Sequence, residues 1–256
     1  MMIFSLLQKV ILCFLLMYVS FAKAEVSLKQ LDTSNNEPIL KISELDIVPE
    51  QELIFNQVLQ LKMLTSLSGR HNILGMFALK DENNSRVSYL VELYADSATY
   101  SAYQVSPEQQ NFDFNLRQMI ASKPKETVLR SKYVYNKEAI SSLAHNKVSF
   151  TEIEIKDKKE GEFQQRLMDL VEHAKSSISG VTTLYIAQSY EKSNIWYVIT
   201  VFDTQKQYKN YLRSSIYRNL IAKDSTVVKR HNEVEVTANF LMGQRLVQIN
   251  RFNYQP

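Results

Sequence analysis

Aromatic side chains recur at one spacing in two parts of the chain, and they are the residues that most suggest chemistry. The two sets are Tyr94, Tyr100 and Tyr103, and Phe202, Tyr208 and Tyr211, each member 108 positions after its counterpart. Residues three apart share one face of a helix. Tyr100 and Tyr103, and likewise Tyr208 and Tyr211, therefore place their rings on one face of an expected helix. Aromatic stripes at helical spacing usually belong to a core.

Histidine is the other residue type considered for proton transfer near neutral pH. The four histidines are His71, His145, His173 and His231. They share no motif and no i, i+4 spacing, so no metal site is expected. His231 alternates with polar residues on an expected strand and could face the interior of a closed sheet as a catalytic base. The alternative is a solvated strand histidine. No acidic pair, Ser-His-Asp order or nucleophile elbow is visible.

The same interval of 108 positions relates longer stretches, which indicates an internal duplication. Ser43-Glu44-Leu45-Asp46-Ile47 returns as Thr151-Glu152-Ile153-Glu154-Ile155. A repeat of this length is the size of a domain, too long for a solenoid, and it fixes the architecture. The duplication therefore predicts two modules with the same order of elements.

Each half reads as strand, helix, two strands, helix, strand. In the first half these are 39–47, a helix from Pro49 to Gly69, strands 73–79 and 87–94, a helix from Ser97, and strand 126–135. In the second they are 150–155, a helix around 163–174, strands 180–187 and 195–202, helix 204–222 and strand 226–236. The first helix of each half has an apolar stripe: Ile54, Val58, Leu61, Met63, Leu64 and Leu67, and then Phe163, Leu167, Leu170 and Ala174.

This order predicts an α+β fold of two tandem ferredoxin-like (β-α-β-β-α-β) modules. Each module leaves one sheet face bare, and the sister module is the obvious cover. The sheets would pack face to face, or close edge to edge, as a pseudo-dimeric α+β barrel within one chain. The expected divisions are a signal peptide at 1–24, modules at 38–135 and 148–237, a linker at 136–147 and a tail at 238–256 that could add a strand.

The N-terminal segment has the pattern of a cleavable signal peptide. Lys9 precedes the apolar run Val10–Val19, and Ala22-Lys23-Ala24 has the small-x-small pattern of a cleavage site. We therefore expect cleavage after Ala24 and a periplasmic or secreted protein. The alternative is an uncleaved membrane anchor.

Composition excludes several classes of protein. Cys13 is the only cysteine and would leave with the signal, so the mature chain would have no disulfide and no thiolate nucleophile. The formal charge of +3 would fall to +1 on loss of Lys9 and Lys23, which leaves no electrostatic footprint for nucleic acid or an anionic membrane. The chain has only 5 glycines and no phosphate-binding glycine motif.

The second half resembles a known family in the stretch Ile199–Ala222 (ITVFDTQKQYKNYLRSSIYRNLIA). An aromatic strand end is followed by a helix with Tyr208 and Tyr211, and Val91–Asp96 with Tyr100 and Tyr103 repeats the pattern. These features resemble the antibiotic biosynthesis monooxygenase domain, whose relatives include quinol monooxygenases and small haem-degrading oxygenases. The resemblance covers about 40–135 and 148–236, two copies in one chain where relatives commonly pair two chains.

The residues that the haem-degrading branch uses are absent here. That branch has an asparagine on the first strand and a tryptophan and a histidine on the second helix. The corresponding residues in this chain are Ser43 and Thr151, Tyr103 and Tyr211, and Asp113 and Ile221. Many other members carry a histidine where Tyr103 stands. Haem degradation is therefore not expected, although Tyr103 or Tyr211 could ligate ferric haem as a phenolate.

The resemblance implies an exported, cofactor-independent monooxygenase-like protein that acts on a quinol or another small aromatic. It also implies that the aromatic sets line the substrate pockets, one formed by Tyr94, Tyr100 and Tyr103 and the other by Phe202, Tyr208 and Tyr211. The alternative for these residues is ordinary packing in a core. No cofactor, metal, nucleic-acid partner or membrane partner after signal removal is expected, and the pseudo-dimer could be a monomer. One alternative is a non-catalytic periplasmic protein that binds a small hydrophobic ligand or a protein partner. A third interpretation is haem binding through tyrosine.

Overall fold

The computed structural model describes residues 37–69, 72–137, 140–142, 146–176, 179–222, 226–244 and 248–252. The expected signal peptide, His71 and His145 lie outside these residues. Within the described ranges, none of the helices has the length and apolar character needed to cross a membrane.

The first module contains β1 (Ile39–Asp46), the 3-10 turn η1 (Pro49–Gln51), α2 (Glu52–Ser68), β2 (Ile73–Asp81), β3 (Val87–Tyr94), α3 (Ser97–Gln104), α4 (Pro107–Leu116) and β4 (Lys125–Asn136). β1 pairs with both β3 and β4, and β3 pairs with β2, all antiparallel. The strand order is therefore β4-β1-β3-β2, as the ferredoxin-like pattern predicts.

The second module repeats this arrangement with β6 (Lys147–Ile155), α5 (Glu160–Lys175), β7 (Val181–Ser189), β8 (Ile195–Phe202), α6 (Gln205–Arg213), α7 (Ser215–Ile221) and β9 (Val228–Gly243). β6 pairs with β8 and β9, and β8 pairs with β7. The strand order β9-β6-β8-β7 matches that of the first module.

The second helix of each module is two helices, where the sequence pattern predicted one. Ser106 and Ser214 begin the second piece in each case, and their hydroxyls accept hydrogen bonds from the backbone N–H of Gln109 and Tyr217. A serine N-cap stabilises a helix start, and Pro107 favours a first helical turn. The same break therefore occurs in both modules for the same local reason.

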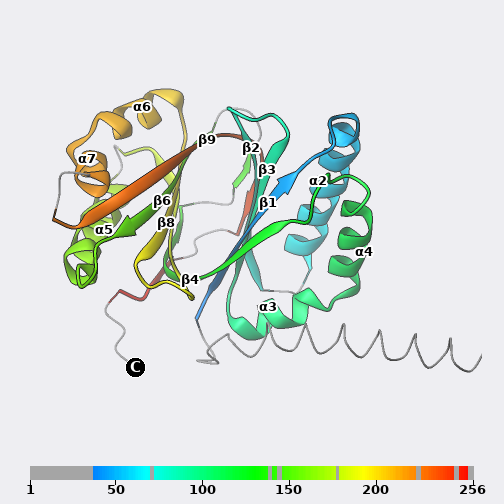
Figure 1. Ribbon diagram of the computed structural model, residues 1–256, viewed down its shortest axis with the longest axis horizontal. Helices are drawn as coiled ribbons and strands as arrows, with labels where there is room; N and C mark the ends of the chain where they lie inside the picture. Colours follow the sequence, from blue (N-terminus) through cyan, green and yellow to red (C-terminus); the bar gives the residue numbers. More distant parts are fainter. Residues whose placement is uncertain are drawn as a thin grey trace, which may run out of the picture. The chain divides into compact units, whose positions relative to one another are not determined.

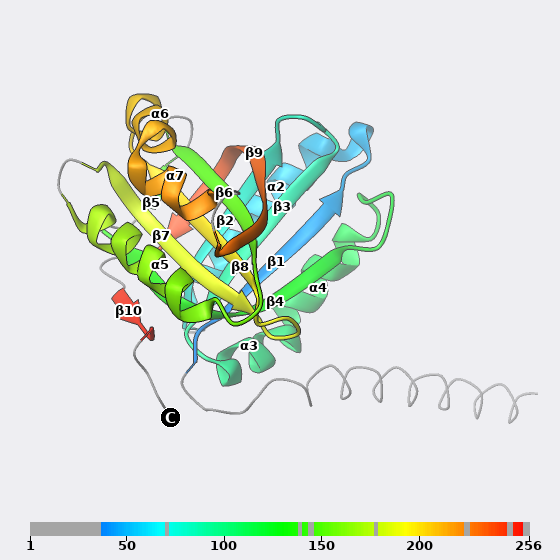
Figure 2. The ribbon, with the colours of Figure 1, turned by 60° about the vertical axis from the view of Figure 1, so that its left-hand side comes forward.

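The two sheets close edge to edge into one barrel. β2 pairs with β9 and β4 pairs with β7, so eight strands from the two modules form a continuous antiparallel ring (Figure 2). The helices of the first module lie on one outer side and those of the second module on the other (Figure 1). The predicted intrachain pseudo-dimeric α+β barrel is confirmed, in its edge-to-edge form.

Three details of the strands differ from or complete the prediction. β9 continues to Gly243, beyond the expected end at Val236, because its later half pairs with β2. The expected linker contains β5 (Ile140–Ser142), which pairs with β9. In the tail, β10 (Gln248–Asn250) pairs with β4 and is the extra strand anticipated there.

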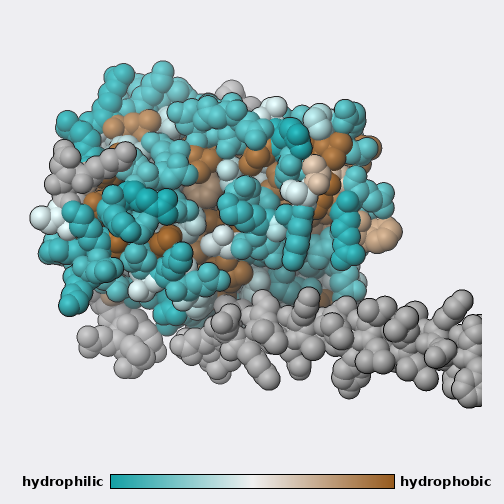
Figure 3. All heavy atoms as spheres, viewed as in Figure 1, coloured by the Kyte–Doolittle hydropathy of each residue, from teal (hydrophilic) through white to brown (hydrophobic). Residues whose placement is uncertain are grey.

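The barrel interior is an apolar core shared by the two modules. Its members include Leu40, Phe77 and Leu93 from the first module and Phe150, Tyr185 and Ile199 from the second. Phe77 and Tyr185 stack with ring centroids 5.1 Å apart. The face in Figure 3 is mostly hydrophilic, with apolar patches scattered over it. Burial of this shared interior is what joins the modules into one unit.

The layers between sheet and helices differ between the modules. In the second module this layer is apolar and includes Phe163, Leu167, Leu170, Trp196 and Phe202. In the first, the buried residues of α2 are Phe55, Leu59, Lys62, Met63 and Ser66. The stripe predicted for α2 is wrong at Ile54, Leu61 and Leu64, which are exposed, and is confirmed at Met63, which is buried. The face that α2 buries therefore includes polar positions.

Candidate active site

A buried cluster of charged side chains lies between the sheet and the helices of the first module. Lys41 on β1 is directly opposite Glu92 on β3. Their neighbours Leu40 and Leu93 belong to the barrel core, and side chains alternate along a strand. Lys41 and Glu92 therefore face the helices, where Lys62 approaches from α2.

The two lysines share Glu92. Lys62 Nζ is 3.0 Å from Glu92 Oε1, and Lys41 Nζ is 3.8 Å from Glu92 Oε2. The side chains of both lysines are 3% exposed and that of Glu92 is 1% exposed. Lys41 Nζ also lies 2.7 Å from Glu126 Oε1 on β4. Lys41 and Lys62 carry two positive charges against the single negative charge of Glu92, and Glu126 supplies the second negative charge that balances them.

A second chain of contacts runs from Lys62 towards α4. Lys62 Nζ donates to Gln109 Oε1, and Gln109 Nε2 donates to Asp113 Oδ1 at 2.7 Å. Lys62 also donates to the Tyr103 hydroxyl at 3.4 Å, and that hydroxyl is hydrogen-bonded to Ser66. Glu92 is thus linked to two outer carboxylates, to Glu126 through Lys41 and to Asp113 through Lys62 and Gln109.

The environment of the cluster shifts several pKa values. Burial alone would lower the pKa of Lys41, but Glu92 and Glu126 outweigh it and hold that pKa above its usual value. Burial would raise the pKa of Glu92, yet Lys62 and Lys41 hold it below its usual value. The pKa of Asp113 is raised, because burial outweighs the opposing effect of Lys41 and Lys62. Lys41 and Glu92 therefore stay charged at neutral pH, while Asp113 is a stronger base than an exposed aspartate.

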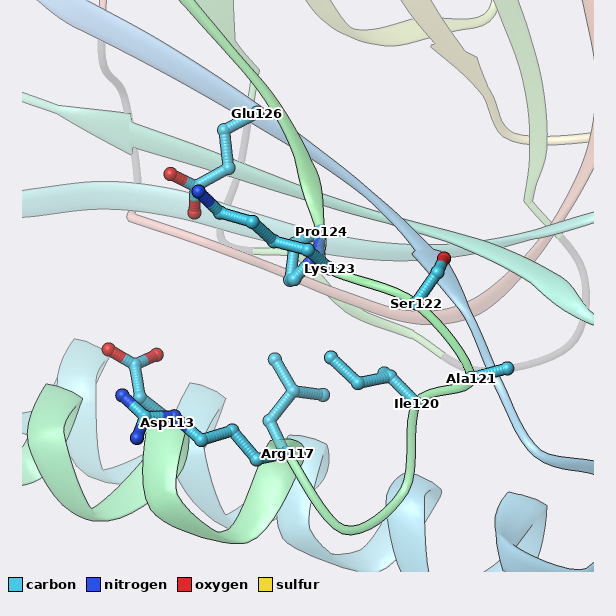
Figure 4. Close-up of a pocket in the computed structure, with 9 residues that line it drawn as sticks. Asp113, Arg117, Ile120, Ala121, Ser122, Lys123, Pro124 and Glu126 are labelled. Carbon is cyan, nitrogen blue, oxygen red and sulfur yellow. The ribbon is translucent and has the colours of Figure 1, made fainter.

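The two outer carboxylates line one pocket of about 560 Å³ between the end of α4 and the start of β4. Figure 4 shows Asp113 on α4 and Glu126 on β4 presenting their carboxylates from opposite walls. The remaining lining residues are Leu116, Arg117, Ile120, Ala121, Ser122, Lys123 and Pro124. Its volume lies within the range of small-molecule sites, roughly 300–1,000 Å³. Such a site can hold an aromatic ring and present it to a base.

The structure brings the three predicted tyrosines of the first module together behind this pocket. The ring centroid of Tyr94 is 5.2 Å from that of Tyr100 and 5.7 Å from that of Tyr103. The Tyr94 hydroxyl accepts a hydrogen bond from Gln104 Nε2 at 3.4 Å. These tyrosines are buried against the ionic cluster, and none of them is among the residues that line the pocket.

The predicted aromatic set of the second module is also brought together. Phe202 lies 5.8 Å from Tyr208 and 5.0 Å from Tyr211, and Tyr211 lies 5.0 Å from Tyr217, between ring centroids. A pocket of about 300 Å³ in this module lies elsewhere, between α5 and α7. It is lined by Arg166, Asp169, Ile216, Asn219 and Ala222. The predicted aromatic residues therefore belong to packed layers in both modules.

His231 does not face the barrel interior. On β9 it lies opposite Ile153, and Ile153 belongs to the apolar layer under the helices of the second module. Paired residues of an antiparallel ladder share a face, so His231 is on the helix-bearing side, and the predicted orientation is wrong. Among the described residues, no group of three or more His, Cys, Asp or Glu side chains could hold a metal ion.

The sequence interpretation missed Lys41, Lys62, Glu92, Asp113 and Glu126. Two carboxylates 13 positions apart in sequence, Asp113 and Glu126, line one pocket, although no acidic pair was visible beforehand. A usable signal was the duplication itself. Subtracting 108 from the stripe Phe163, Leu167, Leu170 and Ala174 gives Phe55, Leu59, Lys62 and Ser66, which are the residues that α2 buries.

The second module carries uncharged residues at most positions of the cluster. Counting 108 positions from Lys41, Lys62, Ser66, Glu92, Tyr94 and Asp113 gives Ser149, Leu170, Ala174, Thr200, Phe202 and Ile221. Glu126 has a counterpart, because Glu126 lies opposite Ser43 and Glu233 lies opposite the equivalent Thr151. Glu233 accepts a hydrogen bond from Tyr217 and has no lysine equivalent to Lys41 beside it. The charged site is thus confined to the first module.

Comparison with known proteins supports the fold and finds a family-model match in the second module. The sequence model of the antibiotic biosynthesis monooxygenase family matches residues 148–223. Among curated proteins, none matches the chain.

Solved structures match over most of the chain. A Fusobacterium nucleatum protein provisionally named a monooxygenase matches 84% of this chain and 99% of its own, with 17% identity and a TM-score of 0.77. A Lactobacillus acidophilus protein with the same provisional name matches 84% and 100%, with 16% identity and a TM-score of 0.75. An anthrone oxidase-like protein matches 82% and 94%, with 8% identity and a TM-score of 0.53. Residues 148–223 therefore match the antibiotic biosynthesis monooxygenase family model, and the chain shares the fold of these structures.

Proposed function

We propose that the protein is a monooxygenase that oxidises a small electron-rich aromatic, such as a hydroquinone, in the pocket of the first module. The observation that supports this most is the pairing of that pocket with a charged cluster. Asp113 lines the pocket, and Lys41, Glu92 and Lys62 lie behind its wall. The family match of residues 148–223 supports the reaction class.

The reaction requires a general base and a site that stabilises an anion. Asp113 accepts the hydroxyl proton of the hydroquinone, and its raised pKa makes it better suited to this than an exposed aspartate. The deprotonated ring supplies the electrons that reduce dioxygen. One oxygen atom is added to the ring, and the other leaves as water with the two hydrogen atoms that the ring loses, so that a hydroxyquinone results.

The remaining groups position and stabilise the substrate. Leu116, Ile120 and Pro124 give the pocket an apolar wall for the ring, which excludes water around the reacting anion. Lys41 stays charged and provides positive charge close to the pocket through its contact with Glu126. Preorganised charge of this kind stabilises negative charge as it develops.

Oxygen consumption with chemically reduced menadione tests the proposal. The wild type should consume dioxygen and release a hydroxylated menadione, and Asp113→Asn should lower kcat by about 10²–10⁴-fold, the usual contribution of a general base. Asp169→Asn is the matched control, because Asp169 is an exposed residue of the pocket in the second module. Equal rates for Asp113→Asn and the wild type would show that Asp113 is not the general base.

A non-catalytic protein that binds a small hydrophobic ligand is the second candidate. The second module supports it, because the counterparts of Lys41, Lys62 and Glu92 there are uncharged and packed. No oxygen uptake with any hydroquinone, together with a ligand retained by the purified protein, would favour this candidate.

We also propose that the protein is exported from the cytoplasm. The pattern around Lys9, Val10–Val19 and Ala24 supports export to the periplasm or medium. Mass spectrometry of the protein recovered from its native compartment should give a chain that starts at Glu25. A retained Met1 would contradict cleavage.

A further inference from the structure

We infer that the pocket of the first module holds its ligand in anionic form, which for the proposed substrate is the phenolate left after Asp113 accepts its proton. The anionic oxygen of the ligand replaces the Glu126 carboxylate beside Lys41. The inference rests on the proposed function for the choice of pocket. It concerns binding, which can be measured without turnover.

The fully buried charges of the cluster do not balance without Glu126. Lys41 and Lys62 are both 3% exposed, and the one carboxylate buried with them, Glu92, is 1% exposed. Glu126 supplies the second negative charge at 2.7 Å from Lys41 Nζ. An uncompensated buried ammonium is strongly destabilising. The position beside Lys41 Nζ is therefore an anion site, and Glu126 fills it when the pocket is empty.

Glu126 is the ion-pair partner of Lys41 that a ligand anion can displace. Its side chain is 50% exposed and lines the pocket, whereas Glu92 is enclosed between two lysines. A half-exposed carboxylate regains hydration when it turns outward, so its release costs little, as for other exposed ion pairs. Glu92 has no such route to water. A ligand anion that enters from the pocket therefore meets Glu126 first and competes with it for Lys41.

The lining of the pocket defines the class of ligand. Leu116, Ile120 and Pro124 suit an aromatic body, while Arg117 and Lys123 add two cations to the wall. Together with Lys41 and Lys62, the cluster and the pocket hold four cationic side chains against the three carboxylates of Glu92, Asp113 and Glu126. This balance favours an aromatic carboxylate or phenolate over a neutral ligand of the same shape and disfavours a cation.

Two isosteric probes test the inference by calorimetry. 2-Naphthoate should bind more tightly than the neutral 2-naphthamide. Glu126→Gln removes the competing carboxylate and leaves Lys41, so it should tighten 2-naphthoate by about tenfold and leave 2-naphthamide unchanged. Glu233→Gln is the matched control, because Glu233 is the counterpart of Glu126 in the module without the lysine pair, and it should change neither affinity.

A second variant identifies the cation. Lys41→Gln, checked for native circular dichroism, should abolish the preference for 2-naphthoate over 2-naphthamide. Lack of binding of either probe, or a Glu126→Gln effect equal for both probes, would overturn the inference. Selective 2-naphthoate binding without oxygen uptake would leave the anion site standing and remove the oxygenase. Oxygen uptake without a preference for 2-naphthoate would leave the proposed oxygenase standing and remove the anion site.

Discussion

Lys62 on α2 and Leu170 on α5 occupy the same position of a duplicated helix. The other residues that α2 buries, Phe55, Leu59, Met63 and Ser66, have buried counterparts on α5 at the same interval: Phe163, Leu167, Val171 and Ala174. One fold thus accommodates a lysine or a leucine at this position. The apolar layer of the second module shows what packing alone requires, so the charges of the first module are an addition that packing does not explain.

The first prediction concerns the stability of the charged cluster. Glu92→Thr installs the residue of the second module, Thr200, but leaves Lys41 and Lys62 without their shared partner. Loss of one member of a buried ion pair typically costs about 3–5 kcal/mol, and we expect a loss of that size in the free energy of unfolding measured by urea denaturation.

The triple variant Lys41→Ser, Lys62→Leu, Glu92→Thr provides the matched comparison. It removes all three charges and copies Ser149, Leu170 and Thr200. Because no unpaired charge is left in the core, this variant should be more stable than Glu92→Thr alone. A triple variant less stable than the single one would show that the three charges do not compensate one another.

The second prediction concerns the pH dependence of catalysis. A base must be ionised to act, so kcat/KM should rise with pH through the pKa of Asp113, which lies above the usual aspartate value because of burial. Lys62 lowers that pKa. Lys62→Leu should therefore move the acidic limb of the profile to higher pH. An acidic limb that stays in place would show that a group other than Asp113 titrates. Lys209→Leu is the control for loss of a positive charge, because Lys209 is an exposed residue of α6.

The third prediction separates the two tyrosines at equivalent positions. The Tyr103 hydroxyl contacts Lys62 and Ser66, whereas Tyr211 lies within an apolar layer, in ring contact with Phe202 and Tyr217. Tyr103→Phe should lower kcat/KM for reduced menadione severalfold, because Lys62 and Ser66 lose a partner. Tyr211→Phe keeps the aromatic ring and its packing, so it should leave both kcat/KM and the free energy of unfolding nearly unchanged. Similar kinetic losses in both variants would indicate that both modules are active.

The barrel could be predicted from the sequence because each element of one half has a copy in the other half. The alternation Glu44-Leu45-Asp46-Ile47 and the aromatic strand ends recur after 108 positions, so an ambiguous element in one half is supported by its copy. Edge-to-edge closure was harder to foresee, because it depends on pairing between β2 and β9, which are far apart in the chain. The break of each second helix was readable from the serine caps but was outweighed by continuous helical periodicity.

The candidate site was not predicted, and the reason is the apolar surface of α2. Ile54, Leu61 and Leu64 form a helical stripe that looks like a buried face, yet all three are exposed. Lys62 is not part of that stripe, yet it is buried. Asp113 and Glu126 are ordinary surface residue types on separate elements, and only the fold brings them to one pocket. Tertiary context, which periodicity does not carry, decided each of these positions.

The fourth prediction is that the two modules unfold as one unit. The barrel closes through pairing of β2 with β9 and of β4 with β7, and the stacked rings of Phe77 and Tyr185 cross its interior. Trp196, the only tryptophan, is buried in the second module, so its fluorescence reports on that module. Glu92→Thr, in the first module, should therefore lower the urea midpoint seen by Trp196 fluorescence by the same amount as that seen by far-UV circular dichroism. An unchanged Trp196 transition, with a shifted circular dichroism transition, would mean that the second module stays folded without the first and that the shared barrel is not what stabilises it.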